Sequence, residues 1–215
     1  NSTLTDGASY ATAFAGAKGA LFSEDDLLIS GSGSLTVTGN YAHGLVCDDG
    51  ITVESGEITV VSAVKDAVHA NDLVKISGGS LTVQQASGDG IHCEANVEIS
   101  GGKLDINSKG DGIKAAANTA NEDEISAEQT VASSNVTISG GEIKINSEED
   151  GIQADSALVV SNGVIDVTTT GVVNKTNQGE TFPGGGGMFP GGGFGGGTRP
   201  GRGERPNQGT PPQET

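Results

Sequence analysis

One polar position recurs along the sequence with the side chains that metal binding uses. It stands two residues before the apolar residue that closes each of a series of short segments, and it holds His43, Asp66, Asp89, Asp111 and Asp150 in turn. If the segments stack about 4.8 Å apart, neighbouring carboxylates repel by about 1 kcal/mol at the dielectric of water and by several-fold more near protein. A hard cation relieves that repulsion, and calcium accepts carboxylate, carbonyl and water oxygens in flexible geometry. The column therefore predicts a calcium site formed by Asp66, Asp89, Asp111 and Asp150.

A second set of polar residues flanks this column. His69 and His92 share one position of successive segments, with Lys114 next, while Glu94 and Asp155 stand three residues after the closing apolar residue. One histidine would be weak evidence, but two in register and facing outward can line a ligand groove. We therefore predict that these five residues bind substrate. No Cys/His cluster with the spacing of a zinc motif is present, so the sequence does not predict zinc.

Turn formation is the competing explanation for the aspartates. Asp-Gly is a favoured turn dipeptide, because Asp hydrogen-bonds its own backbone and Gly accepts a positive φ. Asp89, Asp111 and Asp150 are each followed by Gly. Turn chemistry is the better explanation for any one of them, and only the recurrence over four segments favours a metal site.

A repeat provides the elements that position these residues. The closing apolar residues are separated by steps of 24, 23, 23, 22 and 39, and 39 is 22 plus an insertion of 17. Each unit alternates apolar and polar residues between glycine-rich turns, which is typical of short strands. A leucine-rich repeat has this length but needs fixed Leu and Asn positions, and a two-sheet sandwich needs no repeat in register. We predict an all-β fold, a right-handed parallel β-helix with three short strands and 22–24 residues per coil. The closing residues are Leu21, Leu45, Val68, Ile91, Ile113 and Ile152.

Composition divides the chain at about residue 172. Residues 1–172 hold 7 Lys, no Arg and 25 Asp or Glu, a net charge of −18, whereas the residues that follow are rich in Gly and Pro. We predict a β-helix domain over 1–172 and a disordered tail over 173–215, whose arginines can contact an anionic cell-wall polymer. The acidic coils lack the basic surface that nucleic acid needs, and no apolar run is long enough for membrane insertion.

Further expectations concern the ends of the repeat and its cysteines. The chain starts inside a coil, so we expect N-terminal coils to be missing from it. The acidic insertion 116–134 is expected to overhang the corner at Asp111. Cys47 and Cys93 fall in one column two coils apart, which puts their α-carbons roughly 9–10 Å from each other. A disulfide needs about 4.4–6.8 Å, so both are predicted to be free core thiols.

Three stretches carry a resemblance to a known family. They are F-S-E-D-D-L-L-I-S-G-S-G-S-L-T-V at Phe22–Val37, the I-S-G-G motif followed by D-G-I at Ile99–Ile113 and Ile138–Ile152, and the Gly-rich tail. The chain resembles secreted bacterial carbohydrate-binding domain proteins with a pectate-lyase-like right-handed β-helix. This resemblance implies calcium as a cofactor and non-catalytic attachment to plant cell-wall polysaccharide, especially acidic sugars such as polygalacturonate. It also implies an extracellular or cell-surface location.

Only part of the aspartate column matches the motif of the family that the chain resembles. Asp89, Asp111 and Asp150 match its D-G-I motif, whereas Asp66 is followed by Ala67 and His43 replaces the carboxylate. Calcium is therefore least expected at the His43 corner.

Three functions remain open from the sequence. The first is a non-catalytic carbohydrate-binding module, and the absence of Trp argues against an aromatic platform for cellulose. The second is a calcium-dependent pectate lyase, for which Lys65, Lys109 and Lys114 are the only candidate bases near the aspartates. The third is a structural surface adhesin in which ions serve stability alone. We expect the first, without catalysis.

Overall fold

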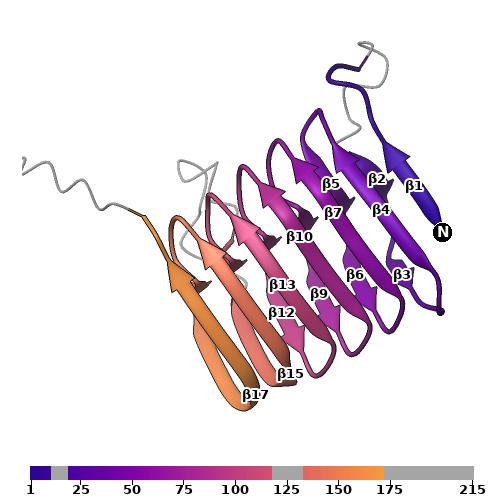
Figure 1. Ribbon diagram of the computed structural model, residues 1–215. Helices are drawn as coiled ribbons and strands as arrows, with labels where there is room; N and C mark the ends of the chain where they lie inside the picture. The colour runs from indigo at the N-terminus through magenta and orange to yellow at the C-terminus, as the bar shows by residue number, and fades with distance from the viewer. Residues whose placement is uncertain (11–18, 118–132, 172–215) are drawn as a thin grey trace, which may run out of the picture. The chain divides into compact units, whose positions relative to one another are not determined.

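The computed structural model describes residues 1–10, 19–117 and 133–171, all within one compact unit, Asn1–Val173. Its strands lie parallel to those of the neighbouring coils and stack into a solenoid (Figure 1). No helix occurs among the described residues, so none of them forms a membrane-spanning helix. The predicted all-β parallel β-helix is confirmed. The predicted disorder of 173–215 lies outside the described residues.

Two faces of the solenoid belong to one eleven-stranded sheet. The first face holds β1 (Ser2–Thr5), β4 (Ser34–Gly39), β7 (Glu57–Ala63), β10 (Ser80–Ala86) and β13 (Lys103–Ser108). The second face holds β3 (Leu27–Ile29), β6 (Gly50–Val53), β9 (Leu73–Ile76) and β12 (Asn96–Ile99). Both faces meet in β15 (Asn135–Ser147), and β17 (Ala157–Thr169) pairs with β15.

The third face is a separate six-stranded sheet, and the candidate site lies along it. Its strands are β2 (Gly19–Ser23), β5 (His43–Cys47), β8 (Val68–Ala70), β11 (Ile91–Cys93), β14 (Ile113–Ala115) and β16 (Ile152–Ala154). Most of them are only three residues long, because the chain turns a corner before and after each one.

The last two coils differ from the predicted three short strands. β15 and β17 are single strands of 13 residues that each run through two faces. Ser139 pairs with Asn162 at the bend, so the ladder continues across it with a shift in register. Glycine with a positive φ stands at this bend in the earlier coils, with 85° at Gly102, and again inside β15, with 97° at Gly141.

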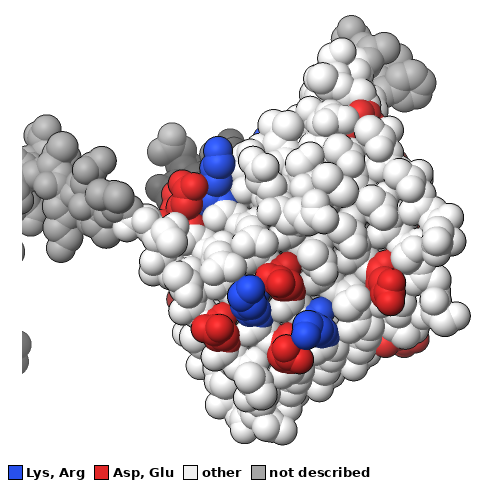
Figure 2. Space-filling view, viewed as in Figure 1, with Lys and Arg blue, Asp and Glu red and all other residues white. Residues whose placement is uncertain are grey.

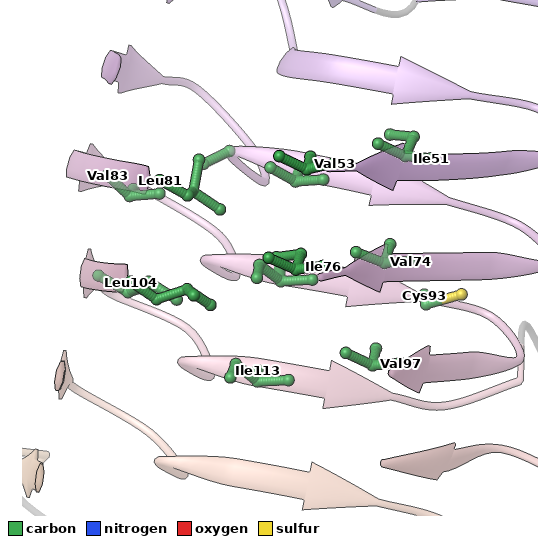
Figure 3. Packing of buried hydrophobic residues seen from close by; sticks show 14 of the residues in the cluster. Ile51, Val53, Val74, Ile76, Leu81, Val83, Cys93, Val97, Leu104 and Ile113 are labelled. Carbon is green, nitrogen blue, oxygen red and sulfur yellow. The ribbon is translucent and has the colours of Figure 1, made fainter. Parts of the chain in front are cut away.

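The apolar columns expected from the repeat form the core. Ile76, Ile99 and Ile138 are partners in successive coils, as predicted. Ile51, Val74 and Val97 form the neighbouring column and lie one above the other in Figure 3. Each coil thus completes the burial of its neighbours, which is why a unit of this size needs the stack to be stable.

The first face carries few charges. Figure 2 views this face and shows acidic groups beside basic ones on a largely uncharged surface. Lys103 and Glu142 pair at 3.0 Å, and Lys144 lies 3.9 Å from Asp105, across β13 and β15.

Both cysteines are free and fully buried, as predicted. Cys47 and Cys93 both pair in register with Ala70, which lies on the coil between them, so the two cysteines are two coils apart. Burial raises the pKa of the Cys93 thiol to about 11 and also raises that of Cys47.

We expect both thiols to resist labelling in the folded protein. A thiol with a pKa of about 11 holds roughly 100-fold less thiolate at pH 8 than one with a pKa of 9, and burial blocks the reagent as well. Release of thionitrobenzoate from Ellman's reagent should be slow in buffer and should reach two thiols per chain in denaturant. Rapid labelling of native protein would contradict this placement in the core.

Candidate functional site

The four predicted aspartates stand in one column at the corner before the six-stranded sheet. The first three carboxylates reach the next coil: the Asp89 N–H donates to Asp66 Oδ1 at 2.8 Å, and the Asp111 N–H donates to Asp89 Oδ1 at 2.7 Å. The Asp150 N–H donates to Asp111 Oδ1 at 2.8 Å. We call these four residues the aspartate ladder. Three of its members are buried, and Asp150, at the end, is exposed.

The glycines directly before Asp89 and Asp111 leave room for two of these contacts. A β-carbon at Gly110 would collide with Asp89 Oδ1, and one at Gly88 would collide with Asp66 Oδ1. The glycine before the aspartate, and not the Asp-Gly dipeptide that suggested a turn, thus leaves space for a carboxylate from the coil before.

Lys114 neutralises the ladder between its second and third members. The Nζ of Lys114 lies 2.9 Å from Asp111 Oδ2 and 3.8 Å from Asp89 Oδ2. Burial alone would lower the pKa of Lys114, but the two carboxylates outweigh it and raise the pKa. This lysine is therefore protonated at neutral pH.

Histidines surround the first member of the ladder. Asp66 Oδ2 lies 3.2 Å from His43 Nδ1, 3.1 Å from His69 Nδ1 and 3.6 Å from His92 Nδ1. The rings follow one another along the solenoid axis: His43 and His69 are tilted at a centroid separation of 4.6 Å, and His69 and His92 meet edge to face at 4.9 Å. Burial would raise the pKa of Asp66, but the three imidazoles outweigh this and hold the pKa far below its usual range. We call these four residues the histidine cluster.

The imidazoles themselves titrate differently. Burial lowers the pKa of His43, which is 6% exposed. Burial also opposes the charged form of His92, but Asp66 and Asp89 raise its pKa overall. The cluster thus contains one ring, His43, whose neutral form is favoured and one, His92, whose cationic form is favoured.

A family model for carbohydrate-binding domain-containing proteins matches residues 1–123 and 85–188. The chain belongs to this family. The resemblance inferred from the D-G-I motifs is confirmed at the level of a carbohydrate-binding domain. No protein with a curated description matches the chain.

A solved structure of similar fold is that of the polysaccharide lyase-like protein from C. thermocellum, as a gadolinium derivative. It has a TM-score of 0.64 and 25% identity to this carbohydrate-binding domain, over 77% of this chain and 63% of that chain. The chain therefore spans less than two thirds of the length of that neighbour.

The predicted substrate-binding residues fall into two groups in this domain. His69, His92 and Lys114 are partners in register on β8, β11 and β14, as the sequence predicted. Their side chains turn toward the ladder and are only partly exposed. Their main contacts are therefore with the carboxylates of the ladder, whose negative charge they offset. Glu94 Oε1 approaches His69 Nε2 at 3.9 Å, whereas Asp155 lies near Gln153 two coils further on.

One member of the site was not found from the sequence. His43 had been noted only as the corner that lacks a carboxylate, although its place in the aspartate column was a signal that it lies beside Asp66. The absence of a zinc motif was also a poor guide, because His43, Asp66 and His69 bring ligand atoms within 4.8 Å of one another. His43 is more than 20 residues from Asp66 and His69 in sequence, and only coil stacking brings it to them. Of the insertion 116–134 that was expected to overhang Asp111, residues 118–132 lie outside the described residues.

Two other polar surfaces adjoin the site. A shallow groove precedes the ladder on the side of the first face; among its lining residues are Gln84, Gln85, Asn107, Lys109, Asn146 and Glu148. On the far side of the six-stranded sheet, Asp25, Asp26, Asp49 and Asp72 crowd the turns that lead into the second face. We call these four the acidic turns. Slight desolvation and the carboxylates of Asp72 and Asp26 raise the pKa of Asp49.

Proposed function

We propose that this domain is a non-catalytic, calcium-binding module for plant cell-wall polysaccharide, with acidic sugars such as polygalacturonate as its ligand, outside the cell. The match to carbohydrate-binding domains carries the proposal. A lyase-like neighbour supports polysaccharide as the class of ligand. The acidity of the coils supports a cation between protein and acidic sugar, since the two would otherwise repel.

The hydrogen bonds of the ladder refine where calcium is proposed. The Oδ1 atoms of Asp66, Asp89 and Asp111 each accept a backbone N–H, and their Oδ2 atoms face histidine or lysine. Calcium needs six to eight oxygens, several of them from water or exposed groups. Of the four predicted ligands, Asp150 has the exposed carboxylate that can provide this.

The acidic turns offer a second place for calcium. Among the described residues, no lysine or histidine pairs with Asp49 or Asp72. Their crowding raises the pKa of Asp49, and a bound cation would remove that cost. We propose that calcium bridges acidic sugar to these turns and to Asp150, on either side of His69, His92 and Lys114.

Binding should depend on calcium. Without chelator, polygalacturonate should retard the protein in affinity electrophoresis, and EGTA should abolish the retardation. Asp49→Asn with Asp72→Asn should weaken binding about 10-fold, or about 1.4 kcal/mol, because it removes two charges and keeps the turn shape. Glu98→Gln, an exposed acidic residue on β12, is the matched control.

Calcium should also stabilise the fold, by about 2.7 kcal/mol at a hundredfold excess over Kd, and magnesium should replace it poorly. Retention of polygalacturonate that is indifferent to EGTA and to calcium would contradict the metal bridge. Failure to bind any of a panel of pectin, xylan and cellulose would contradict the module itself.

The lyase alternative needs a base that can take the proton next to the uronate carboxyl group. Lys114 is a poor candidate, because its carboxylate partners raise its pKa and hold it protonated. Lys65 and Lys109 lie in exposed turns beside the ladder.

We therefore expect no unsaturated product from polygalacturonate with calcium, measured as absorbance at 235 nm over a day. A steady rise that is lost in Lys109→Ala or Lys65→Ala would establish the lyase instead. An inactive outcome together with polysaccharide binding supports the module over the adhesin.

A further inference from the structure

All three histidines of the chain direct a ring nitrogen at one carboxylate oxygen. His43, His69 and His92 come from β5, β8 and β11, and the Nδ1 atom of each lies within 3.6 Å of Asp66 Oδ2. Strand pairing within the six-stranded sheet stacks His69 on His92, and His43 stands at the corner beside them. The convergence is thus a property of three successive coils.

One of these nitrogens is buried without a hydrogen bond. His43 is 6% exposed, and its Nδ1 has no hydrogen-bond partner among the described residues. It lies 3.2 Å from Asp66 Oδ2, but not in the alignment of a hydrogen bond. A buried nitrogen of this kind costs free energy unless a ligand satisfies it.

His43, Asp66 and His69 bring ligand atoms within 4.8 Å of one another, whereas His92 groups instead with Asp66 and Asp89. Zinc bonds of about 2.0–2.1 Å to nitrogen or oxygen place neighbouring tetrahedral ligands roughly 3.3 Å apart. The distances from Asp66 Oδ2 to the Nδ1 atoms of His43 and His69 are 3.2 and 3.1 Å. Imidazole nitrogen suits zinc, copper and nickel, whereas calcium takes oxygen ligands.

The surroundings hold the ligands in place. The Asp89 N–H fixes the other oxygen of Asp66, which orients Oδ2 toward the rings. Such outer hydrogen bonds set the position of metal ligands in known sites. The side chains of His69 and His92 are 16% and 22% exposed, so an ion can enter from solvent.

We propose that His43 Nδ1, His69 Nδ1 and Asp66 Oδ2 bind one divalent transition metal of the zinc class, with water in the open position and His92 beside it. The His92 nitrogen also lies 3.5 Å from Asp89 Oδ2, which is the nearest alternative oxygen ligand. The ion satisfies the buried His43 Nδ1 and ties two successive coils together. The site is distinct from the proposed calcium sites and does not rest on sugar binding.

The test uses the whole chain, freed of metal by EDTA and dialysed. Zinc titrated in a calorimeter should bind at one site per chain and raise the melting temperature, whereas calcium should give no heat at this site. Cobalt should give the intense visible absorption of a tetrahedral complex. The His69→Gln variant should weaken zinc binding at least about 100-fold and remove the cobalt bands.

The variants separate this site from other outcomes. Glu98→Gln, which changes an exposed acidic residue outside the cluster, should bind zinc like the parent chain. Calcium should raise the melting temperature of the His69→Gln variant as it does for the parent chain. The calcium proposal and the transition-metal proposal are therefore tested independently. EGTA removes both metals, and adding back one ion at a time distinguishes them.

His43→Gln provides a second deletion, and because His69 is partly exposed, His69→Gln carries the test if the buried variant fails to fold. Absence of one-site zinc binding, or binding that persists in the His69→Gln variant, would overturn the proposal. The cluster would then be a network of histidines that share protons with Asp66.

Discussion

Replacing Leu104 with alanine should lower the free energy of unfolding by about 2–5 kcal/mol. Leu104 is 1% exposed and lies between Leu81 and Ile143 of the adjoining coils. An interior coil cannot collapse around the gap without breaking the strand pairing on both of its sides. Because each coil is stabilised chiefly by its neighbours, the lesion weakens two interfaces at once. Ile99→Ala should behave in the same way, since Ile99 is also 1% exposed.

Urea unfolding followed by circular dichroism measures this effect. The matched control is Leu28→Ala on β3, because Leu28 is 58% exposed and its loss should change stability by no more than about 0.5 kcal/mol. Equal losses for Leu104 and Leu28 would show that the assigned core column is wrong.

Removing a ladder carboxylate should have the second large effect. Asp111→Ala leaves the Asp150 N–H without its acceptor and takes from Lys114 its nearest carboxylate. Breaking a buried ion pair from one side typically costs about 3–5 kcal/mol. We expect about 2–4 kcal/mol here, because Lys114 is partly exposed and keeps Asp89 within 3.8 Å.

Two further variants separate charge from hydrogen bonding. Asp111→Asn keeps an oxygen for the Asp150 N–H, so it should lose less than Asp111→Ala in the same urea experiment. Glu142→Ala removes an exposed pair with Lys103, which should change stability by about 1 kcal/mol at most. If Asp111→Ala were no worse than Glu142→Ala, the ladder would have no structural role.

The sequence by itself determined the repeat and its columns. The alternation of apolar residues has a period of two, and a shift of one residue would turn the apolar set of a strand outward. Register was therefore fixed by the pattern, and Ile76, Ile99 and Ile138 stack where the spacing put them. The same spacing placed the aspartates in one column and kept Cys47 away from Cys93.

Only the tertiary structure decided what those columns do. Spacing says which residues share a column, but the direction of each side chain depends on the groups that the next coil presents. Asp89 Oδ1 accepts a hydrogen bond from a backbone N–H of the following coil, and Lys114 forms an ion pair with Asp111. The sequence pattern indicated neither contact. His43 lies 23 residues from Asp66 in sequence and 3.2 Å from it in space, because one coil returns the chain to the same corner. Contacts between coils have no local signal in the sequence, so a cluster assembled across three of them emerges only when the chain is folded.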